Sequence, residues 1–155
     1  MFILASASPR RRDLLAQIGA SFRVEVSEAE EMREAKTAEE LVRVNALAKA
    51  RAVAAHAALP VLGADTVVAL AGRIFGKPAD EREAHEMLAA LSGRAHDVLT
   101  GVAWCKAGAY AVQGRAAVFV ERIEGSFSNV VGLPLHAAAH LAEKAGVDLY
   151  DASRA

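Results

Sequence analysis

The segment that most constrains the fold of this chain is Leu4-Ala5-Ser6-Ala7-Ser8-Pro9-Arg10-Arg11-Arg12, close to its start. The apolar run that leads into it, Phe2 to Ala5, predicts a short buried strand. Ser8 and Pro9 predict that a helix begins at once, because serine favours the N-cap and proline the first helical position. A strand that passes directly into a helix is typical of an α/β fold.

The same segment predicts a binding site for phosphate. Arg10, Arg11 and Arg12 place three guanidinium groups on the first turn of the expected helix, where free N–H groups and the helix dipole already favour anions. These arginines follow the carboxyl end of a strand, which is where open α/β sheets bind their ligands. A solvated basic turn is the alternative interpretation, and the position after a strand favours the phosphate site.

The rest of the chain alternates helical and extended patterns. Capping residues, apolar periodicity and glycine or proline breaks predict helices near residues 9–18, 37–58, 80–91 and 134–145, and strands near 22–26, 61–70, 73–75, 98–104 and 117–123. In the helix at 80–91, Met87, Leu88 and Leu91 are expected to face the core. Hairpins after Leu70 and Trp104 predict a mixed sheet. The expected fold class is therefore α/β, with a mixed twisted sheet flanked by helices.

Composition narrows the class of protein. The chain has 155 residues, of which 54% are hydrophobic, so we expect a single domain over residues 1–155 with a real core. The net charge of −1 gives no general signature for nucleic acid, and no segment approaches the length of a membrane-spanning helix. The only cysteine, Cys105, lies in an apolar run and is expected to be a small buried hydrophobic residue. Together with the early arginines, which leave no room for a signal peptide, this predicts a cytoplasmic protein.

Asp65 is the second informative position. It interrupts the apolar run from Val61 to Leu70, and a carboxylate inside a buried strand requires a partner or a metal ion. Taken alone, it fits a structural aspartate and a functional one equally well. A phosphate site nearby favours the functional interpretation, because such a carboxylate holds a divalent ion or activates water.

Several further residues are candidates whose simpler explanation is structural. Lys77, in Phe75-Gly76-Lys77-Pro78, and Lys49, on the long helix, are able to reach a phosphate, but isolated lysines are more often solvated. The acidic residues Glu28, Glu30 and Glu31 fit either a solvated loop or a second metal ligand beside Asp65. Gln113 lies in a loop rich in glycine and alanine, and its amide is able to pair with a base edge unless the loop is a plain hairpin.

Taken in order, these segments resemble the Maf family of nucleotide pyrophosphatases. The matching pieces cover nearly the whole chain: Ala5-Ser6-Ala7-Ser8-Pro9-Arg10-Arg11, Lys49-Ala50, Gly63-Ala64-Asp65-Thr66-Val67-Val68, Gly76-Lys77-Pro78, Leu91-Ser92-Gly93-Arg94-Ala95-His96, Lys106 to Gly114, and Asn129-Val130-Val131-Gly132-Leu133-Pro134-Leu135. The resemblance implies a nucleotide-binding cleft and hydrolysis of nucleoside triphosphates to monophosphate and pyrophosphate. The resemblance is strongest to the branch that acts on dTTP, UTP and related pyrimidine nucleotides. Such an activity implies a role in removing unwanted nucleotides from the cellular pool.

The resemblance also implies roles for individual residues. Asp65 matches the proton acceptor and a metal ligand, and Glu30 best matches the acidic metal-site residue, with Glu31 or Glu28 as alternatives. Arg10, Thr66 and Gln113 match positions that set substrate preference. The phosphate-binding positions are matched by Ser8, Arg11, Lys49 and Lys77. The implied cofactor is a divalent cation, Mg, Mn or Co, and the resemblance leaves a homodimer open.

The chain departs from the family pattern at one place. Members carry an additional segment, with another strand, a helix and an acidic-proline turn, where Cys105 is here followed directly by Lys106. The difference is either a natural deletion or a segment omitted from the sequence, and the intact motifs on both sides favour omission. Two other functions remain open: a purine-preferring pyrophosphatase, and a nucleotide-binding regulator of cell division or septum formation without turnover.

Overall fold

The computed structural model describes residues 1–106, 118–121 and 127–150. The elements follow the order β1 (Phe2–Leu4), α1 (Pro9–Gln17), β2 (Phe22–Val24), α2 (Ala38–Ala54), β3 (Val61–Leu70), β4 (Arg73–Phe75), α3 (Glu81–Leu91), β5 (Asp97–Cys105), β6 (Val118–Glu121), α4 (Phe127–Val131) and α5 (Leu135–Lys144). All the strands and the long helices occur where the sequence predicts them, and only the short α4 was not expected. In the described part of the chain, no helix is both long and apolar enough to cross a membrane.

The strands form one mixed sheet, as the hairpin signals predict. Its order is β2-β1-β3-β5-β6, with β4 paired to β3. β1 runs parallel to both β2 and β3, whereas β3 pairs antiparallel with β4 and β5, and β5 antiparallel with β6. The long β3–β5 pair, in register from Val61 opposite Cys105 to Ala69 opposite Asp97, is the central ladder of the molecule.

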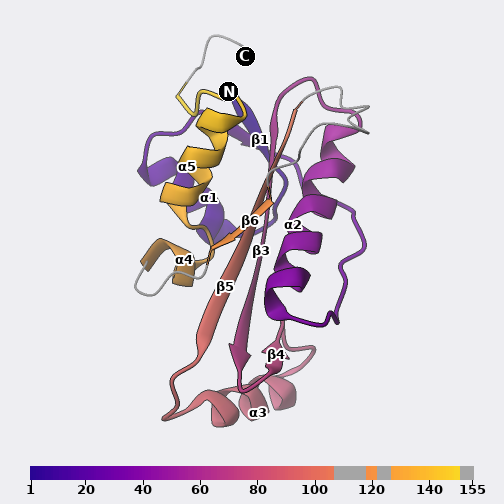
Figure 1. Cartoon of the computed structure of the whole chain (residues 1–155), viewed down its shortest axis with the longest axis vertical. Helices are drawn as coiled ribbons and strands as arrows, with labels where there is room; N and C mark the ends of the chain where they lie inside the picture. Colours follow the sequence, from indigo (N-terminus) through magenta and orange to yellow (C-terminus); the bar gives the residue numbers. More distant parts are fainter. Residues whose placement is uncertain (107–117, 122–126, 151–155) are drawn as a thin grey trace.

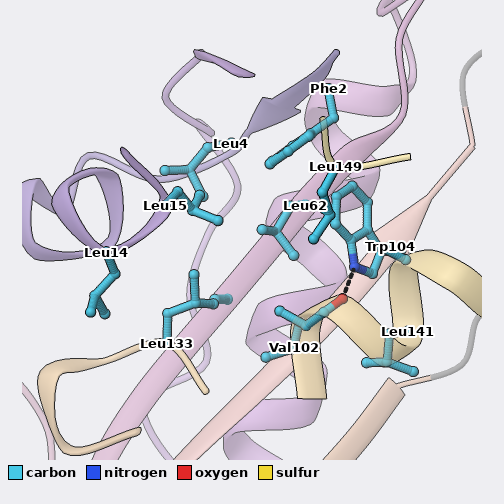
Figure 2. Close-up of a cluster of buried hydrophobic side chains, with 13 residues drawn as sticks. Phe2, Leu4, Leu14, Leu15, Leu62, Val102, Trp104, Leu133, Leu141 and Leu149 are labelled. Carbon is cyan, nitrogen blue, oxygen red and sulfur yellow. Dashed lines mark hydrogen bonds between the residues drawn. The ribbon is translucent and has the colours of Figure 1, made fainter. Parts of the chain in front are cut away.

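Helices cover the sheet on both faces (Figure 1). α1, α4 and α5 lie on one side and α2 lies on the other. On the first side, Phe2, Leu62 and Trp104 pack against leucines of α1 and α5. Figure 2 shows this cluster, in which the Trp104 indole Nε1 donates to the Ala138 carbonyl over 3.1 Å. The hydrogen bond satisfies the polar end of a large buried ring.

Two glycines allow α2 to lie very close to the sheet. A Cβ atom on Gly63 would overlap the Ala46 carbonyl and lie 2.8 Å from the Ala50 nitrogen, and one on Gly101 would overlap the Val42 carbonyl. The small alanines of α2 complete this contact, which was not recognised from the sequence. The close approach brings the polar side chains on this face of α2 within reach of β3.

Predicted caps form at two helices. Thr37 Oγ1 accepts from the Glu40 N–H at 3.1 Å to begin α2, and Asp80 Oδ1 accepts from the Glu83 N–H at 2.7 Å to begin α3. Ser8 lies at the N-cap of α1 as expected, but its side chain makes no capping hydrogen bond.

One prediction about the core is wrong. Met87, Leu88 and Leu91 were expected to face the core, but α3 has no buried residue and Leu88 is 68% exposed. The helical period is present, but α3 follows the β3–β4 hairpin at the far end of the β3–β5 ladder, away from the helices that cover the sheet (Figure 1). Periodicity therefore located a helix but not the surface against which it packs.

Candidate active site

A gap in the strand pairing defines the candidate site. On one edge of β3, β1 pairs with Val61 and Leu62, and β4 pairs with Val68 to Leu70. Between Leu62 and Val68 this edge of β3 has no partner among the described strands. β1 leads into the gap from one end through the start of α1, and the chain leaving β4 leads toward it from the other.

Asp65 lies in this gap, on the face of the sheet that α2 covers. It is 7% exposed, and both carboxylate oxygens have partners on α2. Lys49 Nζ lies 2.6 Å from Oδ1, and Asn45 Nδ2 donates to Oδ2 at 3.1 Å. The charge in the strand is therefore paired and hydrogen-bonded, which is the condition for keeping an ionised carboxylate in the interior.

The acidic loop before α2 contributes a second carboxylate. Glu31 Oε1 lies 3.1 Å from Lys49 Nζ, so Glu31 and Asp65 share one ammonium group. Of the three acidic residues considered from the sequence, the structure therefore joins Glu31 to Asp65 through Lys49. Glu30, which matches the family pattern best, is exposed and makes no hydrogen bond or ion pair with this cluster in the described part of the chain.

Arg11 lies on the opposite face of the sheet, beside Thr66. Its Nε donates to the Gly132 carbonyl at 2.8 Å, Nη1 to Ser6 Oγ at 3.1 Å, and Nη2 to Thr66 Oγ1 at 2.9 Å. Thr66 Oγ1 also lies 2.9 Å from the hydroxyl of Thr100, its neighbour across the β3–β5 ladder. The guanidinium thus connects α1, β3 and the loop after α4.

Burial lowers the pKa of Arg11 from its ordinary value, and the nearby Asp65 carboxylate acts in the opposite direction. An arginine stays protonated under such conditions. Three of its five N–H donors are committed to protein atoms, so at most two remain for a phosphate. Gly132 has a φ of 121°, and this glycine conformation supplies the carbonyl that accepts from Arg11.

The other predicted ligands lie at the surface. Arg10 is exposed on the first turn of α1, Ser8 is half-buried at its N-cap, and Lys77 is exposed two residues after β4. Because Phe75 pairs with Val68, the chain that continues to Lys77 runs toward the unpaired stretch of β3. Gln113 lies outside the described residues.

Sequence reasoning missed two members of these clusters. Asn45 falls four residues before Lys49 in the apolar stripe of α2 and is 3% exposed, and Thr100 is 1% exposed on β5. A polar residue in an apolar helical stripe was the available signal for Asn45. No such signal marks Thr100 in the sequence, because its contact with the Thr66 hydroxyl depends on the register of β5 against β3.

Two carboxylates that converge on one cation resemble a small metal site. The described residues contain no group of three or more histidine, cysteine, aspartate or glutamate side chains able to hold a metal. Asp65 and Glu31 supply hard oxygen ligands of the kind that magnesium uses, and magnesium needs only one or two protein carboxylates when phosphates and water complete its shell. The donor set therefore fits a divalent ion bound together with a phosphate ligand.

Comparison with known proteins identifies the family of this chain. The family described as "Maf-like protein" matches residues 1–106 and 103–145. Proteins named dTTP/UTP pyrophosphatase from Symbiobacterium thermophilum and Myxococcus xanthus are 42% and 43% identical, each over 96% of this chain and 95% and 94% of the relative. One of the same name from Thermococcus gammatolerans is 42% identical over 87% of this chain and 91% of its own length. This chain belongs to the Maf family.

Proposed function

We propose that this protein hydrolyses pyrimidine nucleoside triphosphates, dTTP and UTP among them, to the monophosphate and pyrophosphate. The relatives over nearly the whole chain carry that activity in their names. The observation that carries the proposal in the structure is the pair Asp65–Lys49, a buried carboxylate and ammonium at 2.6 Å in a gap between strands. A buried ion pair is a poor way to stabilise a fold, and its position at an unpaired stretch of strand favours a chemical role.

The residues fit a reaction in which water attacks the α-phosphorus and pyrophosphate leaves. Arg10 and Lys77 are exposed cations on either side of the gap, and they would offset the charge of the triphosphate. Lys49 would contribute the positive charge of its ammonium group from α2. Asp65 would accept the proton of the attacking water, as a positioned general base. Preorganised charges of this kind supply most of the barrier reduction in phosphoryl chemistry.

Asp65 and Glu31 would hold the divalent ion, and when bound it would polarise the phosphate and lower the pKa of a water ligand. Glu31 is preferred here to Glu30 because of its ion pair with Lys49. We take magnesium, manganese or cobalt as the candidates. The protein is further proposed to act in the cytoplasm on a nucleotide substrate, without nucleic acid as a partner.

Base preference is assigned to Arg10, Thr66 and Gln113. Thr66 Oγ1 lies within 2.9 Å of Arg11 Nη2, so a ligand that contacts Thr66 is also beside a fixed guanidinium. Replacing Gln113 with alanine is expected to weaken UTP hydrolysis more than GTP hydrolysis. A lost buried polar contact of this type typically costs about 1–3 kcal/mol. The ratio of kcat/KM for the two nucleotides measures it, and an equal change for both would remove Gln113 from base recognition.

We also propose that a segment which the relatives carry is omitted from the sequence between Cys105 and Lys106. Support comes from the alignment with the Symbiobacterium relative, which has 185 positions over 96% of the 155-residue chain, so at least 30 positions have no residue of this chain. The two matched pieces of the family, 1–106 and 103–145, meet at the same place.

The proposed activity is tested with a panel of nucleoside triphosphates and divalent ions. We expect pyrophosphate and monophosphate in equal amounts, with dTTP and UTP cleaved faster than ATP and GTP. Faster cleavage of purine nucleotides would instead assign the protein to a purine-specific function. Tight nucleotide binding without pyrophosphate release would assign it to a regulatory one.

A further inference from the structure

We propose that Asn45 is a positioning residue, which holds the acidic loop and the Asp65 carboxylate in one arrangement. The inference rests on the proposed function, because it concerns the same site. Asn45 contacts both groups with a single side chain. It lies on α2, one turn before Lys49, and is 3% exposed.

The contact with the loop is a pair of hydrogen bonds to one residue. Asn45 Oδ1 accepts from the Met32 N–H at 2.8 Å, and Asn45 Nδ2 donates to the Met32 carbonyl at 2.9 Å. An amide that pairs in both directions with a backbone fixes the position and the orientation of that peptide segment. Met32 immediately follows Glu31, so this pairing sets where the Glu31 side chain begins.

The contact with Asp65 comes from the same amide nitrogen. Asn45 Nδ2 donates to Asp65 Oδ2 at 3.1 Å, while Lys49 Nζ lies against Oδ1. The two oxygens of the carboxylate are therefore held by two different residues of α2. Rotation of the carboxylate would break one of these contacts, so Asn45 fixes which oxygen faces Lys49 and Glu31.

These contacts together explain why two carboxylates from distant parts of the chain converge on Lys49. The acidic loop has no helix or strand of its own between residues 25 and 37. Near its end, Ala35 packs against the buried cluster that contains Leu41 and Val42, but the Met32 side chain is 47% exposed. At Met32 the loop is held by Asn45, through the backbone. Groups that orient ligand residues in this way typically change metal affinity or activity by about 10–100-fold when they are removed.

The test replaces Asn45 with leucine, which is similar in size and makes no hydrogen bond. The matched control is Val53→Ala, because Val53 is buried on the same helix at 2% exposure, two turns away from Asn45. For Asn45→Leu we expect kcat for UTP to fall about 10–100-fold with little change in KM, and the midpoint for Mn²⁺ binding in the absence of nucleotide to rise about tenfold. Val53→Ala should lower the melting temperature and leave kcat and the Mn²⁺ midpoint near their original values.

Hydrogen exchange gives a readout that does not depend on activity. In the unsubstituted protein the Met32 amide should exchange more slowly than the amides of the exposed residues Glu30 and Arg33, and in Asn45→Leu this difference should disappear. Fast exchange at Met32 in the unsubstituted protein would overturn the proposal, even if Asn45→Leu did not fold. Equal kcat and Mn²⁺ midpoints in Asn45→Leu and Val53→Ala would overturn it as well. If the unsubstituted protein released no pyrophosphate, the proposed function would fail, while the exchange and Mn²⁺ measurements would still decide the role of Asn45.

Discussion

At the scale of single residues, the carboxylate of Asp65 is held by two side chains of α2. Lys49 forms an ion pair with one carboxylate oxygen, and Asn45 donates a hydrogen bond to the other. Glu31 forms a second ion pair with the same Lys49 ammonium. The arrangement keeps a charged carboxylate at 7% exposure without leaving it unpaired. In the proposed reaction this carboxylate would accept the proton of the attacking water and take part in holding the divalent ion.

Asp65→Asn should keep the fold and abolish turnover. Asparagine has the same shape, but it is a poor metal ligand and cannot accept the proton, so we expect kcat to fall on the order of a hundredfold or more. Pyrophosphate release measures turnover, and circular dichroism shows whether the variant is folded. Asp13→Asn is the control, because the Asp13 side chain is 69% exposed and pairs only with the neighbouring Arg12 in the described structure. Near-normal release by folded Asp65→Asn would contradict the assignment.

Arg10 and Arg11, neighbours in α1, should differ in what their substitution changes: ligand binding for Arg10 and stability for Arg11. Arg11→Ala removes three hydrogen bonds to a guanidinium that is 8% exposed, and we expect the free energy of unfolding to fall by at least about 2 kcal/mol. Arg10→Ala should leave stability unchanged and lower kcat/KM for UTP, because Arg10 is exposed.

Urea denaturation and steady-state kinetics on both variants make this comparison. Arg12→Ala serves as the control for a surface arginine, since its pair with Asp13 is exposed and contributes little. Equal shifts in the urea midpoint for Arg10→Ala and Arg11→Ala would contradict the structural role of Arg11.

Sequence reasoning predicted charged members of the candidate site and missed two uncharged ones, Asn45 and Thr100. Asp65 was recognisable because a charge in an apolar strand requires a partner, Arg11 because it belongs to a basic cluster at a helix start, and Lys49 through the family resemblance. Thr100 is an ordinary strand residue whose importance arises only opposite Thr66. Cys105 was expected to be buried but is only partly so, packed beside the cluster that contains Val61 and Ala103. Burial raises the pKa of its thiol, with Arg51 acting against it.

At the scale of helices and strands, glycines of the sheet that lie beneath α2 decide how close this helix can lie to the sheet. Gly63→Ala should lower the free energy of unfolding by about 1–3 kcal/mol or more, because the new Cβ would meet the backbone of α2 at Ala46 and Ala50. Gly76→Ala is the matched control, since a Cβ there meets nothing within 4 Å. Thermal unfolding of the two variants compares them. Similar melting temperatures would mean that α2 does not lie as close to β3 as the structure shows.

Elements were predicted well where local chemistry specifies them. The boundaries of β3 follow its apolar run, and the starts of α2 and α3 follow the caps at Thr37 and Asp80. α3 shows the limit of the approach, because an apolar stripe does not reveal whether a partner surface exists. The close contact between Gly63 and α2 was also hidden, since it depends on how two distant segments approach.

The whole molecule divides its site between the two faces of one sheet. Asp65 and Thr66 are adjacent in β3 and point to opposite sides, toward α2 and toward α1. Their shared position beside the unpaired stretch of β3 is what brings both faces to one site. This topology could not be derived from the motifs, which give an order along the chain but no arrangement in space.

The proposed missing segment has a consequence for the sheet. Among the described residues, β5 pairs with β3 along its whole length and with β6 from Thr100 to Ala103. Inserting the corresponding segment of a relative between Cys105 and Lys106 should raise the melting temperature and kcat/KM for UTP, because added elements would cover the edge and help to exclude water from the site. An insertion that lowers both values would favour a natural deletion over an omitted segment.

The most direct test of the account is pyrophosphate release from UTP and dTTP by the purified protein with Mg²⁺ or Mn²⁺, set beside Asp65→Asn and beside the same protein in excess EDTA. The account predicts one pyrophosphate for each monophosphate formed, lost both on chelation and in Asp65→Asn. Release by the unsubstituted protein that is no greater than release by Asp65→Asn would contradict the central claim.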